Sequence, residues 1–153
     1  MKTKFFPLTA LALSFLILSC GTKEKAPATR KLRYRTAATG LNSCPLKFAQ
    51  SGLCADLQWT QGPTVDGESA FEVSFWASGN GSSSKLTEPT GQVGAFIRMT
   101  CCGSVFFPKV TKVSEGKYLV SNVKFTPGKW EVYIQLKNGN AVEKQFVSVN
   151  LDE

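Results

Sequence analysis

The chain has 153 residues, five cysteines, no histidine and a formal net charge of +7. This length provides one hydrophobic core of ordinary size beside an N-terminal extension, and it excludes two full domains. The lack of histidine excludes catalytic arrangements of the Ser-His-Asp and Cys-His kinds, and the loops contain no glycine-rich phosphate-binding motif. We therefore predict a protein that is not an enzyme.

Residues 1–19 have the pattern of a bacterial export signal. Lys2 and Lys4 precede an apolar stretch over residues 5–18, which is shorter than the about 20 residues of a membrane-spanning helix and fits a signal peptide. The run Ile17-Leu18-Ser19-Cys20 resembles the bacterial lipobox, in which the cysteine receives diacylglycerol and becomes the mature N-terminus. We predict a lipoprotein signal peptide over 1–19 and lipidation of Cys20; an ordinary secretory cleavage site is the alternative. Gly21, by the same resemblance, implies the outer membrane of the cell envelope.

Residues 20–43 are predicted to form a lipidated, basic, flexible tether, because they contain mixed small and polar residues without apolar periodicity. Residues 21–43 hold six cations and one anion, whereas residues 44–153 hold ten of each. Nucleic-acid binding needs a basic face on the domain itself, so we predict none. The tether lies next to the lipid, where each cation can gain about 1 kcal/mol from anionic headgroups; a solvated spacer is the alternative.

Apolar and polar residues alternate with period two through most of the remaining chain, as expected for half-buried strands. Six segments show this pattern clearly: 53–60, 71–77, 93–101, 116–125, 129–137 and 142–149. Asn138-Gly139 predicts a tight hairpin turn between the last two. Residues 105–113 show a weaker pattern, and Pro108 indicates an edge strand there. About seven strands predict an all-β, immunoglobulin-like β-sandwich over residues 44–153.

Three runs in this region resemble the YtkA-like family of small bacterial extracytoplasmic β-sandwiches, which is related to FixH-like domains. They are Met99-Thr100-Cys101-Cys102-Gly103-Ser104, Gly116-Lys117-Tyr118 and Phe125-Thr126-Pro127-Gly128-Lys129-Trp130-Glu131-Val132. The resemblance covers about 70–150 and implies that Trp130 fills the core. FixH-like members are associated with cytochrome oxidase assembly, and the family has a Met-Pro-x-Met-x-His-Gly-like candidate metal segment. Cys101 and Cys102 stand where its second Met and its His would fall, so a copper role does not carry over directly.

Four cysteines remain after lipidation of Cys20: Cys44, Cys54, Cys101 and Cys102. An even number in an exported chain predicts two disulfides, with three possible connectivities. Adjacent Cα atoms lie about 3.8 Å apart, below the about 4.4–6.8 Å of bridged cysteines, which disfavours a Cys101–Cys102 bridge. We therefore expect Cys44 and Cys54 each to pair with one member of the later pair. The two loops, of about 48 and about 58 residues, would each contribute about 4 kcal/mol in the chain-entropy model.

The alternative to these disulfides is a soft-metal site. Thiolates and a thioether are ligands that Cu(I) prefers, and Met99 and Cys101 share one face of the predicted strand at i, i+2. Cys102, Cys54 or Cys44 could complete the site, although a Met and a Cys in an apolar row also serve as core packing. Two functions remain open: an accessory or binding module with structural disulfides, or an extracytoplasmic Cu(I)-binding protein.

Exposed aromatic side chains are the second functional signal. Trp76, Phe96 and Tyr133 fall on the polar faces of their predicted strands, and one member of Phe106-Phe107 should face outward. Exposed apolar patches mark sites of protein interaction. We predict that these residues form a surface for an envelope protein partner; burial by sandwich packing is the alternative.

Overall fold

The computed structural model describes residues 44–80 and 85–151. The predicted signal peptide (1–19), the lipidated Cys20 and the tether (20–43) lie outside the described residues and stay predictions. Among the described residues, no helix is long and apolar enough to cross a membrane.

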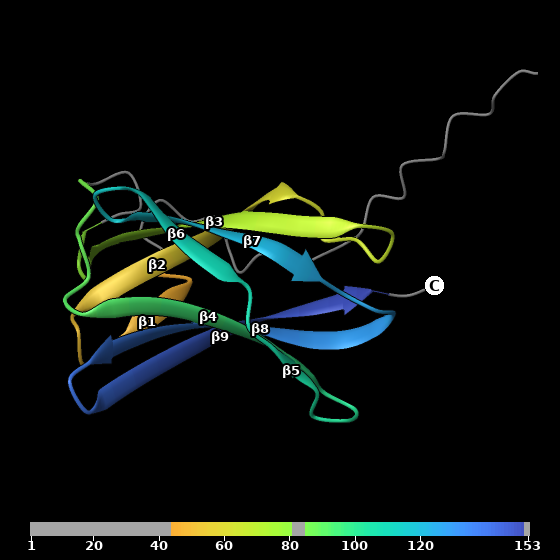
Figure 1. Cartoon of the computed structure of the whole chain (residues 1–153). Helices are drawn as coiled ribbons and strands as arrows, with labels where there is room; N and C mark the ends of the chain where they lie inside the picture. Colours follow the sequence, from red (N-terminus) through yellow and green to blue (C-terminus); the bar gives the residue numbers. More distant parts are fainter. Residues whose placement is uncertain (1–43, 81–84, 152–153) are drawn as a thin grey trace, which may run out of the picture. The chain divides into compact units, whose positions relative to one another are not determined.

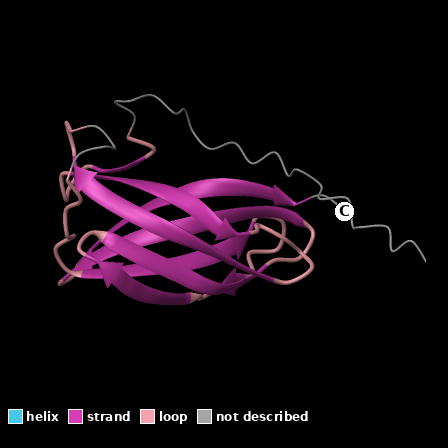
Figure 2. Ribbon diagram, turned by 90° about the horizontal axis from the view of Figure 1, so that it is seen from above, coloured by secondary structure: helices cyan, strands magenta, loops and turns pink. Residues whose placement is uncertain are grey.

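The described chain forms nine strands and no helix (Figures 1 and 2). Their bounds are β1 Leu46–Phe48, β2 Leu53–Gln61, β3 Glu68–Ala77, β4 Gln92–Met99, β5 Val105–Phe106, β6 Lys109–Ser114, β7 Lys117–Lys124, β8 Gly128–Asn138 and β9 Ala141–Leu151. Sheet A has the order β1-β2-β3-β7-β6, and sheet B has the order β5-β4-β8-β9. All pairs are antiparallel. The predicted all-β sandwich is confirmed.

The core lies between the two sheets and is built from alternate residues of the longest strands. Phe71, Val73 and Phe75 of β3 are fully buried, as are Val132 and Ile134 of β8. Successive side chains of a strand point to opposite faces, so the period-two pattern in the sequence becomes one buried face and one outer face for each sheet. The expected core position of the tryptophan in β8 is also correct: Trp130 is 6 % exposed, and its indole N–H donates to the Thr126 carbonyl oxygen at 2.8 Å.

The segment 105–113, predicted as one weak strand, consists of two strands in different sheets. β5 pairs with β4 in sheet B, whereas β6 pairs with β7 in sheet A. Pro108 lies between them and is buried. Proline has no backbone N–H to donate to a neighbouring strand. The pairing of β5 with β4 therefore ends before Pro108, and the chain continues into β6 of the other sheet.

Trp76 is 1 % exposed, so the prediction that it belongs to an exposed surface is wrong. It faces away from the core, as its parity indicated, but this part of sheet A is covered. Leu86 forms a β-bridge with Trp76, and Thr87 N–H donates to the Phe75 carbonyl at 2.9 Å. The opposite residue in β2 is the disulfide-bonded Cys54. A returning loop therefore pairs alongside β3 at this end of sheet A, and Trp76 lies between Leu86 and Cys54.

Glu88 fastens that returning loop to the start of β7. Its carboxylate accepts hydrogen bonds from Gly116 N–H at 2.7 Å and from the Tyr118 hydroxyl, and it forms an ion pair with Lys112 at 2.8 Å. These bonds, led by the Gly116 N–H, lower the pKa of Glu88 to about 2, because hydrogen bonding to a carboxylate favours its charged form. Glu88 is thus a structural anion.

Candidate functional site

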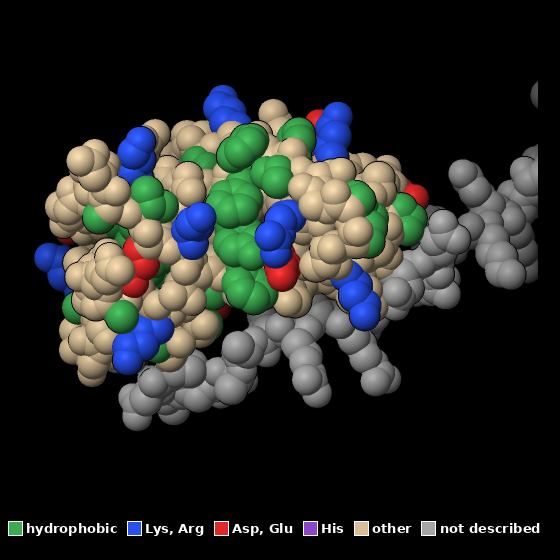
Figure 3. Space-filling model, turned by 90° about the horizontal axis from the view of Figure 1, so that it is seen from below, with side chains coloured by type: hydrophobic (Ala, Val, Ile, Leu, Met, Phe, Trp, Pro, Cys, Tyr) green, Lys and Arg blue, Asp and Glu red, His purple; other side chains and the backbone are tan. Residues whose placement is uncertain are grey.

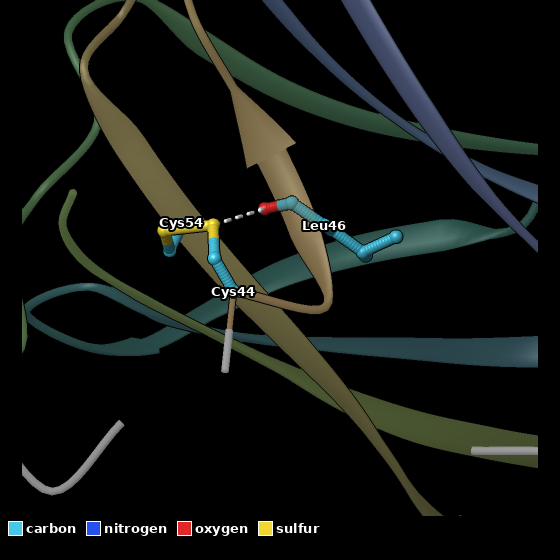
Figure 4. Close-up of a disulfide and its surroundings, with 3 residues drawn as sticks. All are labelled: Cys44, Leu46 and Cys54. Carbon is cyan, nitrogen blue, oxygen red and sulfur yellow. Dashed lines mark hydrogen bonds between the residues drawn. A yellow bond between two sulfur atoms is a disulfide. The ribbon is translucent and has the colours of Figure 1, made fainter. Parts of the chain in front are cut away.

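The cysteine pairing differs from the one predicted. Cys44 and Cys54 form a disulfide with a Cα–Cα distance of 5.2 Å (Figure 4). It joins the segment before β1 to β2, across the hairpin that these two strands form. The predicted cross-pairings with Cys101 and Cys102 are therefore wrong. A disulfide that closes a longer loop stabilises the folded state more. The β1–β2 hairpin nevertheless brings Cys44 next to Cys54, and this proximity decides the pairing.

Cys101 and Cys102 are free thiols at the exposed tip of the β4–β5 hairpin. The hairpin is closed by two backbone hydrogen bonds, Met99 N–H to the Ser104 carbonyl at 2.9 Å and Gly103 N–H to the Met99 carbonyl at 3.0 Å. Gly103 has φ +72° with open space around it, a backbone conformation that glycine adopts without strain. This turn takes both cysteines out of the apolar row of β4.

The turn brings sulfur atoms together. Cys102 Sγ lies 3.6 Å from Met99 Sδ and 3.3 Å from Ser104 Oγ. The hydrogen bond to the Ser104 side chain lowers the pKa of Cys102, whereas hydrogen bonding with Cys102 raises the pKa of Cys101. The turn thus favours a thiolate at Cys102 beside a protonated thiol at Cys101. We call Met99, Cys101 and Cys102 the sulfur cluster; the described residues contain no group of three or more His, Cys, Asp or Glu side chains able to hold a metal ion.

The second candidate site is a line of four aromatic rings on the outer face of sheet B, which we call the aromatic row: Phe107, Phe96, Tyr133 and Phe146. The register places Phe96 of β4 opposite Tyr133 of β8, and Tyr133 opposite Phe146 of β9. Ring centroids lie 4.5 Å apart in the first pair and 5.2 Å apart in the second. Phe107 extends the row beyond Phe96 at 6.1 Å. Figure 3 shows it as a green column across this face.

Charged side chains border the aromatic row. Arg98 and Glu131 form an ion pair at 2.6 Å, and the Tyr133 hydroxyl donates to the same carboxylate at 2.9 Å. These contacts, with the Tyr133 hydrogen bond as the largest cause, lower the pKa of Glu131. The Arg98 guanidinium also lies 5.7 Å from the Tyr133 ring centre, and the Lys144 ammonium lies 5.9 Å from that of Phe96. Both cations are within cation–π range.

The structure thus places two of the three predicted surface residues in contact. Phe96 and Tyr133 are confirmed as neighbours, whereas Trp76 is buried on the other sheet. Sequence reasoning missed Phe146, which is 48 % exposed. Its signal is parity: Phe146 lies between Lys144 and Ser148 at i−2 and i+2, so all three belong to one outer face.

Comparisons of this chain with protein-family models, curated proteins and solved structures find no match. The resemblance to the YtkA-like family therefore stays a prediction.

Proposed function

We propose that this protein is a lipid-anchored envelope protein that acts as a non-catalytic binding or accessory module. The observation on which the proposal rests is the aromatic row, an apolar surface on the outer face of a disulfide-stabilised β-sandwich. Phe107 and Phe146 are 72 % and 48 % exposed. Contact of an apolar surface with water is unfavourable, so a partner that covers this surface gains free energy of binding.

The membrane anchor in this proposal rests on the N-terminal sequence. The lipobox-like run ending at Cys20 supplies a lipid, and the basic residues of 21–43 add attraction to anionic headgroups. A single lipid chain holds a protein weakly, whereas several acyl chains, or one chain with a basic segment, hold it stably.

Photo-crosslinking in cells tests the binding surface. We expect the full-length chain with p-benzoylphenylalanine in place of Phe146 to form a discrete adduct on illumination, in the envelope of the organism that encodes it. The same amino acid at Thr111, an exposed position on β6 of sheet A, should form none. Equal adducts at both positions, or none at either, would contradict the proposal.

Detergent partitioning of the same cells is the control for the anchor. The wild-type chain should enter the detergent phase, and the Cys20→Ala variant should remain in the aqueous phase or stay unprocessed. If the wild-type chain were aqueous, the lipid anchor would be wrong although the binding surface would stand.

A second candidate function, Cu(I) binding, is favoured by the 3.6 Å distance between Cys102 Sγ and Met99 Sδ. A thiolate and a thioether side by side form a soft ligand pair, and Cys101 on the same turn supplies a third sulfur. The cluster is exposed, so a metal ion could be received from or passed to another molecule at this tip.

Cu(I) titration tests this second function. We expect the reduced domain to bind one Cu(I) in competition with a chromophoric Cu(I) chelator. Cys102→Ser should weaken the affinity at least about tenfold, equal to about 1.4 kcal/mol, and Met99→Leu should weaken it less, because a neutral thioether is the poorer ligand. Val105→Ser is the matched control, since it changes an exposed side chain of the same hairpin but removes no sulfur. Unchanged affinity in Cys102→Ser would exclude the sulfur cluster.

A further inference from the structure

The geometry of the aromatic row restricts what it can bind. The rings of Phe96 and Tyr133 are almost parallel, with 7° between their planes. The Phe146 ring lies against Tyr133 from the other side, with 36° between their planes. Phe96 and Phe146 thus flank Tyr133 from the strands on either side of β8. The neighbouring rings limit the open ring face that a stacking sugar needs at Tyr133, and the row crosses the sheet as a narrow apolar ridge.

The outer face of sheet B is basic around that ridge. β8 alternates between buried core residues and an outer face that contains Lys129, Glu131 and Lys137. Arg98 and Lys144 lie on the neighbouring strands. Strands β4, β8 and β9 therefore place four cations on this face against one carboxylate, which is already paired with Arg98. Figure 3 shows blue side chains on both sides of the green column.

This charge argues against two occupants from the same chain. The segment 21–43 holds six cations and one anion, so the basic face repels it. In a two-fold dimer the same patch faces itself, and Lys129, Lys137 and Lys144 would then approach their own copies. Like charges across an interface oppose association. A partner with the opposite charge is required.

The shape of the face favours a protein over a bilayer. Insertion into the headgroup region requires apolar groups that reach about 5–10 Å into it. Phe107 and Phe146 at the two ends of the row are exposed, but Phe96 and Tyr133 at its centre are only partly exposed, and the Tyr133 hydroxyl is bound to Glu131 within the face. Aromatic residues and arginine at the centre with other charges at the rim form the arrangement typical of protein interfaces.

We propose that the aromatic row docks onto an extracytoplasmic protein whose binding surface has an apolar groove bordered by carboxylates. The aromatic row fills the groove, and Lys129, Lys137 and Lys144 face the carboxylates. This inference rests on the proposed function, because it names the partner of the same surface. Complementary charges at the rim accelerate association and make it sensitive to salt.

The test begins with the adduct formed at position 146 of the full-length chain. The crosslinked species is identified by mass spectrometry, and the partner protein is then purified for affinity measurements. We expect the triple variant Lys129→Glu, Lys137→Glu, Lys144→Glu to weaken binding at least about tenfold. For the wild-type protein, affinity should fall by a similar factor between about 50 and 500 mM KCl, because salt screens rim charges.

A triple variant on sheet A and its connecting loop, Lys47→Glu, Lys85→Glu, Lys124→Glu, changes the net charge equally and should alter affinity less than about threefold. An adduct with a lipid, a glycan or a second copy of this chain would overturn the inference while the binding surface remained. A protein adduct whose affinity is insensitive to salt and to the sheet B variant would overturn it likewise. Failure to form any adduct would overturn both the inference and the proposed function.

Discussion

Phe75→Ala is expected to destabilise the domain by about 3–5 kcal/mol, the range for truncating a fully buried aromatic side chain. Phe75 is 0 % exposed, and its ring lies 5.8 Å from that of Phe48 and 5.9 Å from that of Tyr118. It thus joins β1, β3 and β7 of sheet A on the core side, and truncation leaves a cavity among three strands. A domain of this size has a total stability of about 5–15 kcal/mol, so the variant should be near its unfolding threshold at 37 °C.

Chemical denaturation of the purified domain measures this loss, with Phe146→Ala as the matched control. The control removes the same atoms from a side chain that is 48 % exposed. We expect it to cost less than about 1 kcal/mol, mainly from its contact with Tyr133. Similar losses in the two variants would mean that the outer face of sheet B is packed as tightly as the core, which would contradict the docking surface.

The core could be predicted from the sequence because parity along a strand is a local property. Phe71, Val73 and Phe75 alternate with polar residues, and so do Val132 and Ile134 in β8; all five are buried. Whichever way the strands pair, one face of such a segment must leave water, and the apolar face gains the most free energy from doing so. The fold class follows from the number and spacing of these segments.

Parity could not predict what covers an outer face. Trp76 and Phe96 both lie opposite to the core side of their strands, yet one is fully buried and the other half-exposed. Trp76 differs in having Leu86 beside it, from the segment after β3, in an isolated β-bridge. Such a contact depends on the path of the loop, and the apolar–polar alternation within a strand does not predict it.

The candidate sites were predicted in part for the same reason. Phe96 and Tyr133 were identified as outward-facing, but their stacking depends on the register that places them opposite each other. The sulfur cluster was predicted as the row of Met99 and Cys101 on one strand face. In the structure the close pair is Met99 and Cys102, because the strand ends at Met99 and the chain turns. A turn brings i and i+3 together, whereas a strand aligns i and i+2.

Removal of the disulfide is expected to cost about 2.7 kcal/mol, the chain-entropy value for a closed loop of about 11 residues. Cys44 and Cys54 are ten positions apart in the sequence, and the crosslink restricts only this short segment of the unfolded chain. We expect the double variant Cys44→Ala, Cys54→Ala to show this loss in denaturant titrations under oxidising conditions. The cross-paired disulfides, with loops of about 48 and about 58 residues, would instead contribute about 4 kcal/mol each in the same model.

The double variant Cys101→Ser, Cys102→Ser is the decisive control for this pairing. Both thiols are exposed and free in the structure, so their replacement should change stability by less than about 0.5 kcal/mol, as for other surface substitutions. Alkylation of the folded domain without reductant should modify both of these cysteines and leave Cys44 and Cys54 unmodified.

A large loss of stability in this control, or protection of Cys101 and Cys102 from alkylation in the metal-free protein, would restore the cross-pairings and remove both ligands from the Cu(I) site. If the control holds, the short disulfide stabilises the domain while the two thiols at the hairpin tip stay available for chemistry, and the structural and reactive cysteines of this chain are separate pairs.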